Sequence, residues 1–116
     1  MRKLKKGRKF SRKRDQRQAL LKSLASTLIL KEKIKTTEAK AKELRLFLEK
    51  YITRAKNKDL ANQRFLMRFF PLKVVKKLIE EIGPRYKERK GGYIRIIRLG
   101  RRNLDGAKMS IIEFVK

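Results

Sequence analysis

The chain has 116 residues, with 36 lysines and arginines against 11 acidic residues, so its formal net charge is +25. This length fits one domain, and the 41% apolar fraction is enough for one modest core. The absence of cysteine and histidine excludes disulfides, tetrahedral zinc sites and histidine-based catalysis. Self-repulsion at this charge predicts a polyanionic partner.

The N-terminal segment, residues 1–13, is predicted to be a basic RNA-binding arm preceding one compact domain over residues 14–116. Residues 1–18 contain ten bases and one acid. Such dense like charge does not fold alone and becomes ordered on a partner, although a solvated tail is the alternative. The basic start and apolar residues 19–30 faintly resemble a secretory signal or a transit peptide. Because Lys22 interrupts the apolar part and no small-residue cleavage site follows, we expect a cytoplasmic protein.

The first predicted elements are a helix over residues 14–30, with Ser11 as a candidate N-cap, and a short strand over residues 32–36. The helix has an apolar stripe at helical spacing, formed by Leu20, Leu21, Leu24, Ala25 and Leu28.

Two further helices are predicted over residues 37–56 and 60–69, capped by Thr37 and Asp59. Glu38 suits the positive end of the first helix dipole. The apolar face of the first of these comprises Ala41, Leu44, Leu48, Tyr51, Ile52 and Ala55. That of the second comprises Ala61, Phe65, Leu66 and Phe69.

A fourth helix is predicted to start near Pro71 and to end at Gly83-Pro84, where glycine and proline usually stop a helix. Its expected buried face comprises Leu72, Val75, Leu78, Ile79 and Ile82. Across the domain, we expect Leu24, Leu44, Leu48, Leu78 and Ile112 to be buried.

The chain ends in two predicted antiparallel strands, residues 93–99 and 109–115, joined by a loop over residues 100–107. The last strand has apolar residues on both faces, which favours a central or covered position. Alternation places Arg95 and Arg98 on opposite faces, and we expect Arg95 to point away from the helices, towards nucleic acid.

Three basic segments are predicted to contact RNA. The predicted contact residues in the arm and first helix are Arg2, Lys3, Lys5, Lys6, Arg8, Lys9, Arg12, Lys13, Arg14 and Arg17. At the start of the second helix they are Lys35, Thr36, Thr37, Lys40 and Lys42, where free N–H groups favour phosphate, with ordinary capping as the alternative. Towards the C-terminus they are Arg85, Arg89, Tyr93, Arg95, Arg101 and Arg102.

The third basic segment has two further features. Gly91-Gly92 permits close approach of the backbone to a ligand. Tyr86 and Tyr93 are candidates for stacking on bases, although a core position for Tyr93 is the alternative. The one adjacent acidic pair, Glu80-Glu81, is a poor catalytic pair because neighbouring helical residues do not face each other. No catalytic, cofactor or metal site is predicted.

Several motifs occur in the order typical of one known family. They are Met1-Arg2, Gly7-Arg8, Arg17-x-Ala19, Lys35-Thr36-Thr37-x-Ala39-Lys40-Ala41-Lys42-Glu43-Leu44-Arg45, Gly83-Pro84-Arg85-Tyr86, Gly91-Gly92-Tyr93-x-Arg95-Ile96, Leu99-Gly100 and Met109-x-x-Ile112-Glu113. Over essentially the whole chain, this pattern resembles the bacterial large-subunit ribosomal proteins numbered seventeen.

The resemblance implies a structural ribosomal protein that binds 23S ribosomal RNA beside other ribosomal proteins near the nascent-chain exit tunnel. It also implies an α/β fold of the α+β type in two layers: a helix, a strand, three helices and two strands. We expect the sheet to be small and mixed, and the location to be the cytoplasmic ribosome rather than an organellar one.

Composition alone leaves other functions open. A DNA-compacting protein would use the same electrostatics, and it is distinguished by comparing RNA with DNA of the same sequence. A small nucleic-acid enzyme is disfavoured because the chain lacks histidine and a metal-ligand cluster. Membrane-surface binding is disfavoured because the arm lacks an apolar face. No small-molecule substrate is predicted.

Overall fold

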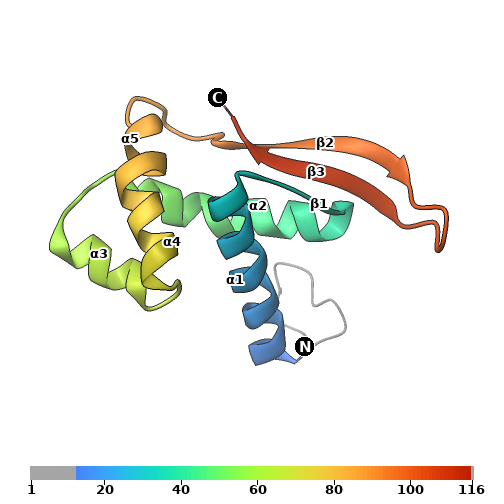
Figure 1. The fold of residues 1–116 in the computed structure, drawn as a ribbon, viewed down its shortest axis with the longest axis horizontal. Helices are drawn as coiled ribbons and strands as arrows, with labels where there is room; N and C mark the ends of the chain where they lie inside the picture. The colour runs from blue at the N-terminus through green and yellow to red at the C-terminus, as the bar shows by residue number, and fades with distance from the viewer. Residues whose placement is uncertain (1–12, 116) are drawn as a thin grey trace, which may run out of the picture.

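The computed structural model describes residues 13–115, and its elements follow the predicted order (Figure 1). They are α1 (Arg14–Lys31), β1 (Lys33–Thr37), α2 (Glu38–Ala55), α3 (Leu60–Met67), α4 (Leu72–Lys77), the π-helical turn η1 (Leu78–Ile82), α5 (Gly83–Arg85), β2 (Ile94–Arg101) and β3 (Lys108–Phe114). The predicted arm and the Ser11 cap lie outside the described residues, apart from the exposed Lys13 that precedes α1.

The starts of α2 and α3 are fixed by the side chains that the sequence indicates. The Thr37 hydroxyl accepts a hydrogen bond from the Lys40 backbone N–H at 3.4 Å. The Asp59 carboxylate accepts one from the Asn62 N–H at 2.8 Å. Both predicted caps are confirmed, and each satisfies an N–H that has no partner within its own helix.

The three strands form one sheet in the order β1-β3-β2, and both pairings are antiparallel. The expectation of a mixed sheet is therefore wrong. The β2–β3 hairpin places β3 beside β1, so β1 and β2 run parallel to each other without being neighbours. The predicted central position of the last strand is confirmed. A register shift between Arg98 and Gly100 marks a bulge in β2.

The helices of residues 13–115 cover one face of the sheet, the lower one in Figure 1, and leave its other face uncovered. Ile94, Ile112 and Phe114 are buried on this face, which packs against α2. Strand alternation therefore places Lys33, Lys35, Met109, Ile111, Glu113, Arg95 and Ile97 on the other face, here called the open face. The predicted orientation of Arg95, away from the helices, is confirmed.

The core joins the helices to the covered face of the sheet. All six predicted apolar positions of α2 are buried. Leu44, Leu48, Leu78 and Ile112 are fully buried as expected, whereas Leu24 is only partly buried.

Two other predicted core positions are wrong. Ala61 is exposed on the first turn of the short helix α3. Leu72 is exposed, and Val74 is buried in its place. Two residues correspond to about 200° around a helix, so Leu72 and Val74 point to opposite sides.

The expected helix stop at Gly83-Pro84 is also wrong, because the helix continues to Arg85. The Gly83 N–H bonds to the Leu78 carbonyl five residues back, which makes the π-helical turn η1. Gly83 has ordinary right-handed helical angles. A Cβ on it would lie 2.3 Å from the Ala55 carbonyl oxygen. The glycine therefore permits close packing against the end of α2 rather than ending the helix.

Candidate nucleic-acid interface

Several of the predicted contact residues are held by acidic groups within the domain. Arg85 pairs with Glu32, which also holds Lys77 at 3.2 Å. These contacts lower the pKa of Glu32, chiefly through the hydrogen bond from Arg85. Lys42 pairs with Glu38 at 3.0 Å. The charge that each of these cations offers to a partner is thus partly neutralised.

Other predicted contacts keep an uncompensated charge. Lys35, Lys40 and Arg101 form no ion pair with any acid in residues 13–115, and Lys35 and Arg101 are exposed. The same holds for Lys33 and Lys108, which sequence reasoning missed. Strand alternation from Lys35 identifies Lys33 as a member of the same face.

The open face of the sheet has cations on both edge strands. Lys33 on β1 and Arg95 on β2 both lie in register with Glu113 on β3. The Arg95 guanidinium donates to the Glu113 carboxylate at 2.9 Å and remains more than half exposed. Lys35 lies in the next row, opposite Ile111. This face therefore presents two cations beside one carboxylate and a third in the next row, and none of the described helices lies over them.

The loop between β2 and β3 is rigidified by one carboxylate. Asp105 accepts two hydrogen bonds from Arg102, at 3.0 and 2.7 Å, and one from the Ala107 N–H at 3.1 Å. These bonds lower the pKa of Asp105 to about 2, the Arg102 contact first. Arg101 donates to the Gly106 carbonyl. The loop thus presents Arg101, with Arg102 held close to Asp105.

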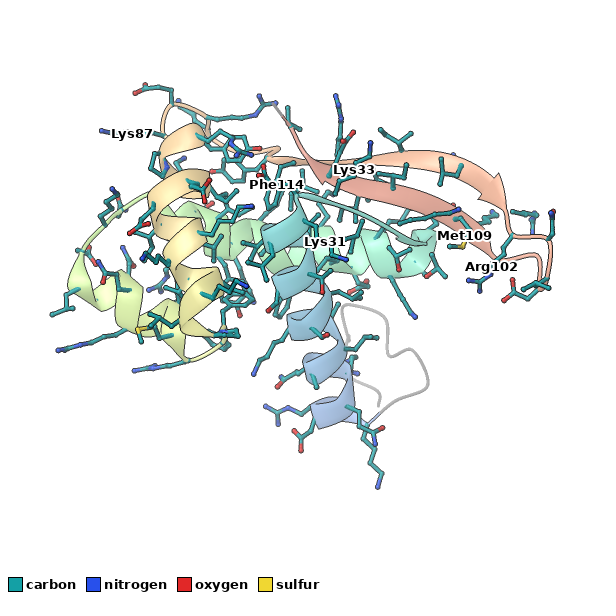
Figure 2. All side chains as sticks on the ribbon, in the orientation of Figure 1. Lys31, Lys33, Lys87, Arg102, Met109 and Phe114 are labelled. Carbon is teal, nitrogen blue, oxygen red and sulfur yellow. The ribbon has the colours of Figure 1, made fainter. Side chains whose placement is uncertain are left out.

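The hairpin carries this loop away from the helices. Figure 1 shows β2 and β3 extending past β1 and the start of α2. Figure 2 places Arg102 and Met109 at this projecting end and Phe114 at the other end, above the core. A projecting, internally bonded cationic loop is suited to contact a surface that the body of the domain cannot reach.

The two threonines at the start of α2 have structural roles, as in the alternative of ordinary capping rather than phosphate contact. Thr36 is buried, and the Thr37 hydroxyl is engaged as the N-cap. Lys35 and Lys40 remain available there for an anion. Lys13, just before α1, and Arg14, its first residue, are exposed, and Arg17 is half-buried.

The tyrosines of the third basic segment belong to the core. Tyr93 is 1% exposed, and its ring packs on Tyr86 with centroids 5.2 Å apart. Burial raises the pKa of Tyr93, but hydrogen bonds with Thr53 and Lys56 outweigh burial and leave the pKa below its usual value. Neither ring offers a free face, so the expectation that they stack on bases fails and the core alternative holds.

The neighbouring Arg89 is exposed and donates to the Gly91 carbonyl. Gly92 has φ 63°, so the turn itself requires this glycine. Within residues 13–115, no cluster of three acidic, histidine or cysteine side chains is placed to hold a metal ion. None of the helices described there has the length and apolar character needed to cross a membrane.

These features define a class: a small, strongly basic α+β domain whose cations lie on a helix-free sheet face and a projecting hairpin. Residues 20–115 match the family profile described as ribosomal protein L17, and the chain belongs to this family. The family consists of structural components of the ribosome, so the chain is not an enzyme.

Relatives named "Large ribosomal subunit protein bL17" match nearly the whole chain. The one from Pelobacter propionicus is 51% identical, covering 100% of this chain and 92% of the relative. The one from Caldanaerobacter subterraneus subsp. tengcongensis is 50% identical, covering 93% of this chain and 97% of the relative. The one from Natranaerobius thermophilus is 48% identical, covering 94% and 97%. The predicted family is confirmed.

Proposed function

We propose that the chain is a structural protein of the large ribosomal subunit in the bacterial cytoplasm and binds 23S ribosomal RNA through its lysines and arginines. The observation that carries this proposal is the set of cations that form no ion pair with an acid among residues 13–115. They are the exposed Lys33 and Lys35 on the open face, the exposed Arg101 and Lys108 on the hairpin, and the half-buried Lys40 at the start of α2. Phosphates are the natural counter-charge for such a surface.

The surroundings in the subunit are part of the same proposal. From the family resemblance, we infer that this protein lies beside other ribosomal proteins near the outer end of the nascent-chain exit tunnel. The open face supports a neighbour of mixed chemistry, because Ile97 is exposed among its cations and Leu99 is exposed in the adjoining bulge of β2. The predicted arm supplies further cations to the same RNA.

The proposal is tested by equilibrium binding of the full chain to fragments of 23S ribosomal RNA and to DNA of the same sequences, at one fixed salt concentration. We expect tighter binding to RNA, because the 2′-hydroxyl and the A-form shape distinguish RNA from DNA. Equal affinity for both would support the DNA-compacting alternative.

The side of the sheet that faces RNA is tested by two matched substitutions. Arg95→Ala is expected to weaken RNA binding and to lower the salt slope by about one. It also leaves Glu113 unpaired on the open face, where it repels phosphate. Arg98→Ala is the control, because Arg98 lies on the helix side, 3.8 Å from Glu38. Filter binding that shows the larger loss for Arg98→Ala would place the RNA on the other face.

A further inference from the structure

A groove of about 440 Å³ lies where α1, α2 and α3 meet, and its lining includes no residue of the open face or the hairpin and one predicted RNA contact, Arg17. Its walls include the partly exposed rings of Phe47, Phe65 and Phe69, with Tyr51 beside them. Three cations, Arg17, Lys22 and Lys50, also line it, together with one carboxylate, Glu43. Aromatic rings with a cationic rim are the combination that binds unpaired nucleotides.

The rings form one connected cluster. The centroid of Tyr51 lies 5.1 Å from those of Phe47 and Phe69 and 6.0 Å from that of Phe65. Phe65 and Phe69 are also 5.1 Å apart. Rings braced by each other in this way lose little conformational entropy when a flat ligand stacks on them.

The cations are held at the rings themselves. Lys22 lies over Phe69 with its ammonium 5.4 Å from the ring centroid. Lys50 lies over Tyr51 at 5.2 Å and over Phe47 at 5.6 Å. A base that stacks on one of these ring faces displaces the ammonium from it, and the long lysine side chain can then pair with the phosphate of the same nucleotide.

The Tyr51 hydroxyl can donate a hydrogen bond to a ligand in this groove. Tyr51 lines the groove, and its hydroxyl makes no hydrogen bond with any residue of the described part of the chain. The hydroxyl oxygen reaches solvent, because the buried side-chain polar atom without a partner in residues 13–115 is Ser110 Oγ instead. Burial of the ring raises the pKa of Tyr51, so the hydroxyl stays protonated, and the edge of a base can replace water as its partner.

We propose that this groove binds a single unstacked nucleotide of RNA, with the base against the phenylalanine rings and its phosphate near Lys22 or Lys50. The proposal deepens the proposed function, on which it rests, by adding a base-binding site to a surface that otherwise recognises phosphates. A protein segment is the competing occupant of the groove. Binding to RNA duplexes with and without an unpaired base distinguishes the nucleotide from the protein segment.

The test uses the full chain and three blunt RNA duplexes of one sequence: fully paired, with one bulged 2-aminopurine nucleotide, and with an abasic nucleotide at the bulge. The bulged and abasic duplexes carry the same phosphates, so their affinity ratio reports the base alone. We expect the base to tighten binding by about 5- to 150-fold. We also expect the 2-aminopurine fluorescence to change when the protein is added.

Variants then locate the base. Phe47→Leu and Phe65→Leu are expected to reduce the ratio of base to abasic affinity towards one, and Tyr51→Phe to reduce it in part. Phe114→Leu is the matched control, because this ring is buried against the sheet and outside the groove. It should leave the ratio unchanged. Circular dichroism identifies any variant that loses its fold. If a leucine variant does not fold, Tyr51→Phe still tests the site, because it removes only the hydroxyl and keeps the ring.

The outcomes separate the two proposals. A ratio near one in the unmodified protein, or a ratio insensitive to the groove variants, would overturn the nucleotide site and favour a protein segment there. Salt-dependent binding of the abasic duplex would in that case still support the proposed function. Loss of all salt-dependent binding would overturn the proposed function itself.

Discussion

The Gly83→Ala variant is expected to lose about 3 kcal/mol of unfolding free energy, the upper end of the usual range for overpacking. The added Cβ would lie 2.3 Å from the Ala55 carbonyl oxygen and 3.1 Å from the Leu78 carbonyl oxygen. Both are backbone atoms, so relieving the steric overlap requires movement of a whole helix end rather than rotation of a side chain. Urea denaturation followed by circular dichroism measures the loss.

Gly91→Ala is the matched control for this prediction. A Cβ on Gly91 would meet nothing within 4 Å, and its φ is not positive. Its unfolding free energy is expected to stay within about 0.5 kcal/mol of the original. Equal stability of the two variants would contradict the packing role given to Gly83.

Leu48→Ala is expected to cost about 2–5 kcal/mol, because Leu48 is fully buried at the centre of α2 and its removal leaves a cavity. Leu46→Ala makes the same change on the same helix at a position 65% exposed, and it is expected to cost less than about 0.5 kcal/mol. Thermal unfolding of both variants compares buried and exposed positions at equal helix propensity. An unchanged melting temperature for Leu48→Ala would show that the wrong face of α2 had been assigned to the core.

The local parts of the fold could be predicted from the sequence because local rules decide them. Hydrophobic spacing indicated the whole buried face of α2, and the caps at Thr37 and Asp59 follow from side-chain chemistry alone. Alternation along the last two strands indicated the central position of β3 and placed Arg95 and Arg98 on opposite faces. The choice of Arg95 for the outward face was based on its place after Gly91-Gly92 and on a face shared with Tyr93; the orientation is confirmed, but Tyr93 itself is buried. The class of protein followed from the order of its motifs, through the family that they resemble.

The features that the sequence could not predict depend on contacts between distant segments. Gly83-Pro84 has the local pattern of a helix stop, but packing against Ala55 and a π-helical turn carry the helix through it. Tyr93 directly precedes β2, and its hydroxyl forms hydrogen bonds with Thr53 and Lys56 at the end of α2, which the local sequence does not show.

The candidate interface also combines features that local sequence patterns predict with features that depend on contacts between distant segments. Charge density located its basic segments, and the i,i+4 spacing of Glu38 and Lys42 could have indicated that ion pair. No local pattern shows that Arg85 is held by Glu32, 53 residues away in the sequence. The aromatic groove was missed as a site for a related reason. Its rings lie on α2 and α3 and immediately after α3, and they meet only in the folded chain.

The central claim is that phosphate neutralisation holds this protein on ribosomal RNA, and the salt dependence of its affinity for 23S ribosomal RNA tests that claim most directly. Each neutralised phosphate releases condensed counterions, so the logarithm of the association constant falls linearly with the logarithm of salt concentration. With roughly six to ten phosphate contacts, the slope should be about −4 to −9. A slope shallower than about −2 would contradict the claim, because too few phosphates would then be engaged to account for the binding.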